Sequence, residues 1–599
     1  MSSTFFSLTN PDHNQDKICF FRIGLPFPKG VLSATSDVCL KDRNTVLADI
    51  GYEVIQLWED GSVKWLSVFG LHQLEANATH KISVSEISSE LVPLSVPVKV
   101  DDESLRIELN DGARIAFSTN RFCDISIREF ESKFCINNVS DLVHQKINTS
   151  HKLFQSNGVF SAVVIEQTAN VKFEGKTLEL TQKSTVFLSD GTIKTEFTFN
   201  NPSAALHPNG QWDLGDPNSL LVSEIGISIN KPASTIKTSV INDNGQAVLS
   251  EISDFTTCSV VQLASGEKNY DCANHVDASG NVPQVFNGYQ IARDNNQTAK
   301  GKQCTPTVLL SGQHSKITLF VSVDKFWQKF PSAIRVDSKH STFSLLGAVG
   351  ASKVELQPGE QSSRSIFISP TDVVEAHVTL CKQSVITSNA IPFLPREECT
   401  DAFNEMISQG ITGEHSFFYK RIAIDEFGWR HFGELYADHE KALQPETEHF
   451  VSHYNNQYDP IQGMLYQWIV SGDQRWFELA DDLAKHVSDI DIYHTQEDKP
   501  EYSGGLFWHT DHYVQAYRAT HRTYSSDQPS NVYDDHAGGG GPGGQHCYTT
   551  GLLLHYLLTG YVPSRDSVVS QSNWISNYYE GDNTLLFALL AYKTQVLKG

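Results

Sequence analysis

Short runs of alternating apolar and polar residues fill the chain up to about Ser369. Alternation at period two is typical of strands that bury one face. Clear examples occupy residues 104–109, 113–117 and 193–199. Asp-Gly and Asn-Gly turn signals separate the runs, and Asp60-Gly61 predicts a hairpin within Trp58–Val68. The pattern therefore predicts a front part built almost wholly from β-strands.

The sequence changes character after Pro395, where apolar residues recur at helical spacing. Helices are predicted over residues 398–409, 462–470, 474–487, 512–520, 549–558 and 584–597. The loops between them are rich in Gly, His, Tyr and Trp. Paired helices that send aromatic-rich loops to one end are typical of an α/α-toroid. Few helices fit before Gly599, which predicts a short or incomplete toroid.

These patterns predict a multidomain protein of the β plus α class. A small N-terminal β-barrel or sandwich is expected at residues 1–90 and a large central β-sandwich at 91–392. The C-terminal α/α-toroid is expected at 393–599, with the active site on its loops. One hydrophobic core rarely supports more than about 250–300 residues, so 599 residues suit such a division. A partner copy, and hence an oligomer, could close an incomplete toroid.

Composition narrows the choice of partners and of compartment. The formal charge of −24, from 70 acidic and 46 basic residues, disfavours nucleic acid and anionic membranes as partners. A site for an anionic glycan would have to be locally positive or rich in hydrogen-bond donors. No signal peptide is visible, and no apolar run nears the roughly 20 residues of a membrane span. We therefore expect a cytoplasmic protein, or a periplasmic or secreted one if a leader was removed, with its ten scattered cysteines reduced.

Residues suited to chemistry concentrate between Phe427 and Tyr548. Clusters rich in His, Tyr, Asn, Trp and Arg cover residues 427–439, 453–463, 502–522 and 536–549. Burying so many polar groups without partners would cost a few kcal/mol each, whereas a wet, aromatic-lined sugar cleft accommodates them. The clusters therefore predict a carbohydrate site on the helical loops.

Six segments of the chain carry a family resemblance. They are Leu25–Gly30, Trp58–Trp65, Gly428–Arg430, Asn455–Asp459, Ser471–Trp476 and Gly538–Tyr548. Together they resemble the exo-rhamnogalacturonan lyase family (polysaccharide lyase family 26) and its YetA-like relatives. The resemblance implies an N-terminal barrel-like domain, a central β-sandwich and a C-terminal α/α-toroid. A fainter similarity to the chondroitin and hyaluronan lyases lies in Gly505–His509, Tyr517 and Asn456.

The resemblance implies an exo-acting polysaccharide lyase that cleaves a uronate-containing acidic polysaccharide, rhamnogalacturonan-like or glycosaminoglycan-like, by β-elimination. Donors must neutralise the uronate carboxylate, a base must take the C5 proton, and an acid must protonate the leaving O4. His509 or His512 suits the base, because imidazole titrates near neutrality. The acid would be a tyrosine, drawn from Tyr458, Tyr513 and Tyr517.

The remaining predicted site residues bind the substrate. Asn455 or Asn456, with Arg430 or Arg518, could hold the carboxylate. Trp508 could stack on a sugar ring, and the Gly-rich loop could present Gln545, His546 and Tyr548. The substrate-binding set is completed by His431, His453 and Arg522.

Each of these assignments has a structural alternative. His509 and His512 could bind a structural zinc with His453 or His494; no cofactor is predicted, but a divalent cation stays open. Asn455 and Asn456 could cap the helix that begins near Pro460. In the same way, Arg430 could pair with Glu434 or Asp438.

Alternatives to the lyase also stay open. The run Gly538–Gly544 lacks the Lys-Ser/Thr of a phosphate loop, so nucleotide binding is not expected. A glycoside hydrolase acting on unsaturated or acidic oligosaccharides could use the same cleft. The third alternative is a non-catalytic glycan-binding protein.

Overall fold

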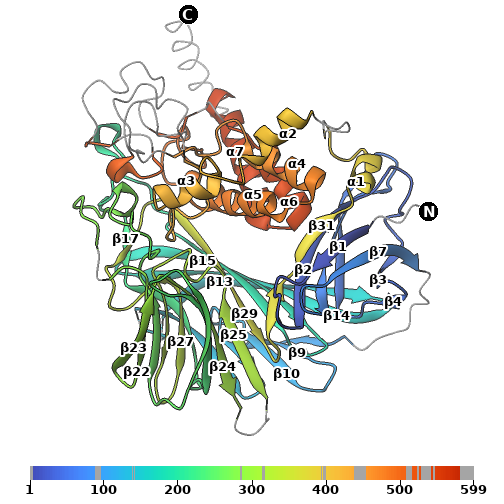
Figure 1. Ribbon diagram of the computed structural model, residues 1–599, viewed down its shortest axis with the longest axis horizontal. Helices are drawn as coiled ribbons and strands as arrows, with labels where there is room; N and C mark the ends of the chain where they lie inside the picture. The colour runs from blue at the N-terminus through green and yellow to red at the C-terminus, as the bar shows by residue number, and fades with distance from the viewer. Residues whose placement is uncertain are drawn as a thin grey trace, which may run out of the picture.

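The computed structural model describes residues 5–87, 96–137, 139–140, 142–283, 286–312, 317–392, 394, 400–436, 453–507, 516–522, 525–527, 541–543 and 547–580. Within these residues the protein is mostly β-sheet, and the helices gather in the C-terminal part. Figure 1 shows the helices lying across the central sheets and beside the N-terminal strands. No helix of the described residues is long and apolar enough to cross a membrane.

The N-terminal domain is barrel-like and consists of two small sheets. Their strands are β1 (Phe5–Thr9), β2 (Lys17–Pro26), β3 (Asp37–Asp42), β4 (Thr45–Val46), β5 (Ile50–Leu57), β6 (Val63–Leu74), β7 (Thr79–Ile87), β30 (Val373–Glu375) and β31 (His377–Leu380). The strand orders are β31-β1-β7-β3-β4 and β30-β2-β6-β5. The predicted hairpin is confirmed: β5 and β6 flank a turn in which Asp60 Oδ1 accepts the Ser62 N–H at 3.0 Å.

Two strands of this domain come from far along the chain. β31 pairs antiparallel with β1, and β30 pairs parallel with β2. The domain prediction assigned residues 373–380 to the central sandwich, whereas their pairing places them in the N-terminal sheets. They lie there because β1 and β2 would otherwise be edge strands with unpaired backbone groups.

The central domain is a large β-sandwich. Its eleven-stranded sheet has the order β23-β22-β21-β26-β27-β18-β12-β11-β10-β9-β8, its nine-stranded sheet β13-β14-β15-β16-β29-β25-β24-β19-β20, and β17 pairs with β28. The first strands are β8 (Val98–Val100), β9 (Ser104–Glu108), β10 (Arg114–Ser118), β11 (Ile125–Ile127), β12 (Phe130–Ile136), β13 (His144–Ser156), β14 (Val159–Phe173), β15 (Lys176–Phe187), β16 (Ile193–Asn200), β17 (Leu220–Val222), β18 (Glu224–Ile229), β19 (Thr235–Ile241) and β20 (Ala247–Ser253). The later strands are β21 (Cys258–Gln262), β22 (Tyr289–Arg293), β23 (Asn296–Gly301), β24 (Gln303–Ser311), β25 (Thr318–Val323), β26 (Ser332–Val336), β27 (Ser341–Gly347), β28 (Val354–Leu356) and β29 (Gln361–Ser369). One hydrophobic cluster fills the space between the two large sheets.

The helical region contains the described helices α1 (Lys382–Ser388), α2 (Asp401–Ser408), α3 (Phe417–Ala423), α4 (Pro460–Ser471), α5 (Gln474–His486), α6 (Thr550–Thr559) and α7 (Val562–Glu580). Short helical turns are η1 (Pro208–Gly210), η2 (Ala273–His275), η4 (Val487–Asp491) and η5 (Tyr517–Ala519). The predicted helices near 398–409, 462–470, 474–487 and 549–558 are confirmed as α2, α4, α5 and α6. The prediction over 584–597 lies outside the described residues, and the toroid stays a prediction.

The N-terminal domain and the helical region share one hydrophobic core. Ile23 and Trp65 of the barrel belong to the same buried cluster as Trp468, Leu552 and Leu558 of the helices. A Cβ at Gly24 would stand 1.7 Å from the carbonyl oxygen of Leu557, so β2 and α6 touch backbone to backbone. The two parts are therefore held together by direct packing.

The cysteines of the described residues are not in disulfides. Cys399 lies outside the described residues, and the other nine cysteines form no disulfide. Six of the nine are buried. This matches the expectation of reduced, mostly buried thiols.

Candidate active-site cavity and buried histidine cluster

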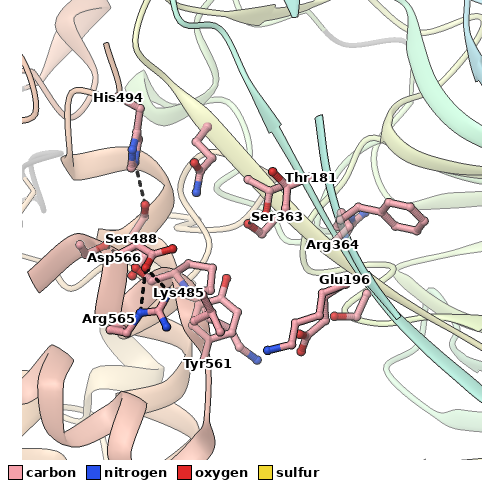
Figure 2. A pocket seen from close by; sticks show the side chains of 18 of the residues that line it. Thr181, Glu196, Ser363, Arg364, Lys485, Ser488, His494, Tyr561, Arg565 and Asp566 are labelled. Atoms are coloured by element: carbon pink, nitrogen blue, oxygen red, sulfur yellow. Dashed lines mark hydrogen bonds and ion pairs between the residues drawn. The ribbon is translucent and has the colours of Figure 1, made fainter. Parts of the chain in front are cut away.

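A cavity of about 560 Å³ lies between the nine-stranded sheet and the helical region. Its sheet side comes from β14, β15, β16 and β29, and its helical side from α5, η4 and the start of α7. Figure 2 shows Thr181, Glu196 and Ser363 on the sheet opposite Lys485 and Tyr561. Small-molecule sites usually measure roughly 300–1,000 Å³, so this cavity suits a short sugar segment.

Strand alternation explains why the sheet side of the cavity is polar. In β16, Phe197 and Phe199 belong to the sandwich core, whereas Glu196 and Thr198 line the cavity. β15 follows the same rule, since Leu180 is in the core and Lys183 lines the cavity. Side chains at odd and even positions point to opposite faces of a strand, so one face fills the core and the other stays polar.

The cavity lining is nearly balanced in charge, although the protein as a whole is strongly acidic. Its basic residues are Lys183, Lys325, Lys329, Arg364, Lys485 and Arg565. Its acidic residues are Glu166, Glu196, Asp324, Asp482 and Asp566. The Arg364 guanidinium is buried and donates to the carbonyl oxygens of Leu345 and Lys329, which leaves five basic groups against five acidic ones. This balance contrasts with the net charge of −24 for the chain, and the basic groups supply hydrogen-bond donors. The lining thus meets the condition that the sequence set for an anionic glycan site.

Two of the lysines are tied to helical carboxylates. Lys325 Nζ lies 3.1 Å from Asp482 Oδ1, and Lys485 Nζ lies 2.8 Å from Asp481 Oδ2. Burial lowers the pKa of both lysines, but the neighbouring aspartates outweigh it and raise the pKa above the usual value. These two ammonium groups therefore stay charged and serve the packing of α5.

The other two lysines are held more loosely. Lys183 Nζ lies 3.9 Å from Glu166 Oε1, and Lys329 Nζ lies 3.9 Å from Asp489 Oδ2. Burial lowers the pKa of both groups, and nearby positive charge adds to the effect. An anion that entered the cavity would favour their protonated forms. Lys183 and Lys329 are thus suited to meet a substrate carboxylate.

His494 and Tyr561 bring proton-transfer groups to the same cavity. His494 Nε2 donates to the Ser488 carbonyl oxygen at 2.8 Å, which leaves the Nδ1 lone pair to accept a proton. Burial lowers the pKa of His494, so its imidazole is neutral near pH 7. Burial, and next the charge of Asp489, raises the pKa of Tyr561 well above its usual value, so its phenol keeps its proton. Base and acid of this kind are what an elimination needs.

Six of the predicted site residues lie outside the described residues, and these are Trp508, His509, His512, Tyr513, Gln545 and His546. The other ten are described, and none of them is among the residues that line the 560 Å³ cavity. Arg430 and His431 line a second pocket of about 250 Å³ against the loops of the central domain. Their catalytic and binding roles stay predictions.

The predicted arginines each have intramolecular partners. Arg430 Nε donates to Glu360 Oε1 at 2.7 Å, so its partner among the described residues is Glu360 and not Glu434; Asp438, the other predicted partner, lies outside the described residues. Arg518 forms a two-bond pair with Asp527, at 2.6 and 3.0 Å.

Arg522 is the third of these arginines, and it is buried. It donates to the Pro358 carbonyl oxygen at 2.6 Å. Its guanidinium also lies 4.9 Å from the centre of the Phe507 ring.

The residues before α4 adopt left-handed backbone conformations. Asn455, Asn456, Tyr458 and Asp459 have φ values of 46°, 57°, 62° and 56°. Asparagine and aspartate tolerate this region better than other residues, which explains the Asn pair here. The helix cap is Asp459, whose carboxylate accepts the Gln462 N–H, so the alternative in which Asn455 or Asn456 caps the helix was wrong.

The Asn side chains instead tie loops together. Asn455 Nδ2 donates to the carbonyl oxygens of Phe507 and His521, at 3.0 and 2.7 Å. Asn456 Nδ2 donates to the Tyr548 carbonyl oxygen at 3.1 Å.

Two of the tyrosines predicted as the acid are among the described residues: Tyr458 is exposed to solvent, and Tyr517 lies at a short helical turn. Tyr458 is 62% exposed, and its ring centre lies 6.0 Å from that of Tyr548. Tyr517 begins η5 with a φ of 48°.

A buried cluster of histidines and carboxylates lies in the helical region. Its seven side chains are all at most 4% exposed, and they are His431, His453, His486, His521, Glu426, Glu434 and Asp491. His431 Nδ1 lies 2.9 Å from His521 Nε2, and His453 Nδ1 lies 3.3 Å from Glu426 Oε1. Lys485 of α5 lines the cavity, while the next residue, His486, belongs to this cluster. The cluster and the cavity therefore share a helix.

Burial and mutual charge perturb the pKa of several groups in the cluster. Burial lowers the pKa of His453 to about 3 and that of His431 and His521 well below the usual value. Burial, opposed by His486, raises the pKa of Asp491 to about 7. Burial lowers the pKa of His486, but the carboxylates of Asp491 and then Glu434 outweigh burial and raise this pKa to about 10. Groups of this kind could hold a cation.

Sequence reasoning missed most of the residues just described. Glu434 and His521 lay within recognised clusters, but His486 and Asp491 stand in ordinary helical surroundings in the sequence. The cavity residues Lys183 and Tyr561 come from a strand and a helix start about 380 residues apart. Only the three-dimensional packing of sheet against helices brings them to one place. The alternating polar face of β15 and β16 was the one available signal.

Comparison with known proteins identifies the N-terminal domain. Residues 9–85 match the family model of the PcRGLX-like N-terminal RIFT barrel domain, the N-terminal domain of rhamnogalacturonan lyase family proteins. This match confirms the resemblance in that part of the chain. A search of curated proteins finds no match.

Solved structures offer only remote likenesses. An α-mannosidase from Enterococcus faecalis V583 matches at 11% identity and a TM-score of 0.25, over 65% of this chain and 45% of that chain. A glycosyl hydrolase family 38 protein from Enterococcus faecalis matches at 10% identity and 0.26, over 65% and 47%. This chain thus spans less than half the length of either protein, and neither likeness carries an argument here.

Proposed function

We propose that the protein is a polysaccharide lyase that acts from the chain end on a uronate-containing glycan. The observation that carries the proposal is the cavity of about 560 Å³, which is lined by lysines, an imidazole and a phenol. The N-terminal match to a rhamnogalacturonan lyase family domain supports the choice of reaction class. The exo mode follows the resemblance to the exo-rhamnogalacturonan lyase family.

The proposed chemistry is a β-elimination with balanced proton transfers. Lys183 and Lys329 neutralise the uronate carboxylate, which makes the C5 proton more acidic. His494 Nδ1 takes that proton, the C4–O4 bond breaks, and a C4–C5 double bond forms. Tyr561 donates its proton to the leaving O4 and is restored from solvent. These roles agree with the pKa directions, because the lowered pKa of His494 leaves it neutral to accept a proton and the raised pKa of Tyr561 leaves it protonated to donate one.

The direct test is the ultraviolet absorbance of the unsaturated uronate product. The protein is incubated with rhamnogalacturonan, chondroitin, hyaluronan, heparin and alginate. We expect absorbance to rise with at least one of them. No rise with any of the five, from protein with the far-ultraviolet spectrum of a folded chain, would reject the proposal.

Site variants test where the reaction occurs. Tyr561→Phe removes only the acid and should lower kcat at least about 100-fold, the usual contribution of such a group. Tyr419→Phe is the matched control, because Tyr419 is 47% exposed on α3, and it should change nothing. Arg430 and His431 mark the second pocket, so His431→Asn separates the two locations. Loss of activity in that variant alone, with the Tm of the parent protein, would move the site to the predicted loop cluster.

A glycoside hydrolase is the second candidate, because Glu166 and Glu196 also line the cavity. Burial raises the pKa of Glu196, but Lys194 and then Arg22 outweigh it and hold the pKa below its usual value. Glu196 is therefore ionised and suits a base or nucleophile. Product mass distinguishes the two reactions, because hydrolysis adds one water and elimination adds none.

A further inference from the structure

Four buried side chains of the cluster meet around one point. Glu434 follows α3, His486 ends α5, Asp491 ends η4 and His521 follows η5. They are 1%, 2%, 0% and 1% exposed. One nitrogen or oxygen of each residue lies within 4.8 Å of all the others. Four segments of the helical region thus send a potential metal ligand to the same place.

The separations between these atoms fit a tetrahedral metal site. His486 Nε2 lies 3.3 Å from His521 Nδ1, 3.4 Å from Glu434 Oε2 and 3.3 Å from Asp491 Oδ1. His521 Nδ1 lies 3.6 Å from Glu434 Oε2 and 3.7 Å from Asp491 Oδ1. Zinc binds nitrogen and oxygen at about 2.0–2.2 Å, which makes the edges of its tetrahedron roughly 3.3–3.6 Å. Good hydrogen bonds are shorter, at about 2.7–3.2 Å.

The hydrogen bonding of Asp491 points the same way. Both of its carboxylate oxygens are buried, and neither accepts a hydrogen bond from a described residue. A buried carboxylate without such bonds is costly unless a cation compensates it, and a metal ion at this point would replace the proton of His486 in that role. Glu434 adds a second carboxylate to the same point. A divalent cation would balance both charges.

Neighbouring groups orient two of the ligands. His521 Nε2 lies 2.9 Å from His431 Nδ1, so with the Nδ1 lone pair of His521 on a metal, its Nε2–H donates to His431. Glu434 Oε1 accepts the Leu435 N–H at 2.5 Å, and Oε2 accepts the Asn455 N–H at 3.1 Å. Contacts of this kind fix ligands at metal sites.

A second histidine group of the same cluster fits a metal less well. His431, His453 and His521 also bring three nitrogens together. The distance of 2.9 Å between His431 and His521 is that of a hydrogen bond. A cation held by three neutral imidazoles would also leave the carboxylates of Glu434 and Asp491 without compensation. We therefore assign His431 to the surroundings of the site.

We propose that Glu434, His486, Asp491 and His521 bind a structural divalent cation, for which zinc is the best fit. Two nitrogens and two oxygens in a tetrahedron suit zinc, whereas calcium and magnesium take six or more oxygens. Four protein ligands and no exposed face are typical of a structural site and not of a catalytic one. The ion would join the loops after α3 and η5 to the end of α5, next to the cavity.

Metal analysis of the intact chain tests the proposal. Protein purified without chelators, saturated with zinc and dialysed should retain about one zinc ion per chain by mass spectrometry. Removing the zinc with a chelator should lower Tm, and adding zinc back should restore it. Replacement by cobalt should give the strong visible absorption of a tetrahedral site. Less than about one fifth of an equivalent, together with an unchanged Tm, would overturn the proposal.

Variants locate the ion and guard against a simple folding defect. His486→Gln and Asp491→Asn should lose the cobalt spectrum, whereas His555→Gln should keep it. His555 is the matched control, because it is equally buried and pairs with Asp481 at 3.1 Å, outside the four ligands. His431→Asn should keep the tetrahedral spectrum with affinity reduced about 10- to 100-fold. A spectrum lost in His431→Asn but kept in Asp491→Asn would place the ion elsewhere and refute the assignment.

Discussion

One carboxylate, that of Asp459, caps two helices at once. Its Oδ1 accepts the Gln462 N–H of α4 at 3.3 Å, and its Oδ2 accepts the Gly551 N–H of α6 at 2.8 Å. The α6 cap residue, Thr549, makes no side-chain capping bond of its own. Asp459 is only 7% exposed, so water cannot readily replace it. Asp459→Ala should therefore loosen the starts of both helices together.

The size of the effect follows from these two bonds. Loss of an N-cap costs about 0.5–2 kcal/mol. A buried N–H left without an acceptor, here that of Gly551, costs about 1–3 kcal/mol. The sum is about 1.5–5 kcal/mol, which corresponds to a roughly 10- to 4,000-fold increase in local opening.

Hydrogen exchange read by mass spectrometry measures this opening peptide by peptide. Protection should fall in peptides that cover residues 460–465 and 550–555 and stay unchanged in the barrel strands. Asp473→Ala is the control, since Asp473 caps α5 with a side chain that is 29% exposed and leaves no buried N–H. It should cost only about 1 kcal/mol. Equal effects of the two variants, or no change around residue 551, would refute the reasoning.

Further predictions concern the N-terminal domain and its packing. Burial lowers the pKa of His80, but hydrogen bonds to Asp42 and a second carboxylate outweigh it and raise the pKa. Protonated His80 therefore stabilises the folded state. This contribution to stability is complete below the ordinary pKa of about 6.5 and is lost as pH rises through the pKa in the folded protein. His80→Gln should therefore make Tm fall less steeply as pH rises. Gly24→Ala should lower Tm, because its Cβ would meet the Leu557 carbonyl oxygen at 1.7 Å. Gly463→Ala should stabilise α4 by about 0.5–1 kcal/mol, since its Cβ would meet nothing within 4 Å, and a lower Tm there would contradict the argument.

Local patterns in the sequence predicted local structure well. Period-two alternation identified strands such as β15 and β16, because successive side chains of a strand point to opposite faces and only one face is buried. Helical periodicity identified α4 and α5 for the same reason. Three helices were not predicted. α1 and α3 have seven residues each, which is too short for a clear period, and the nineteen residues of α7 are mostly polar with a weak helical period.

The site was harder to predict, because it depends on contacts between distant segments. The loops rich in His, Asn and Arg were recognised. In the structure, however, Arg430 donates to Glu360, and the Asn455 side chain donates to backbone carbonyl oxygens. A polar residue in a loop can bind substrate or hold the loop, and composition does not separate the two. His494 and Tyr561 are ordinary residues until the sheet packs against the helices.

The return of β30 and β31 to the N-terminal sheets has a consequence for synthesis. The segment that matches the family model, residues 9–85, emerges from the ribosome long before the two strands at 373–380 that flank β1 and β2. Until then these strands have open hydrogen-bonding edges, which are prone to wrong pairing. A fragment that stops near residue 90 should therefore aggregate, and fusing residues 372–381 to its end should reduce this aggregation without abolishing it, because the face that packs on the helices stays exposed. The first domain to be made is among the last to be completed.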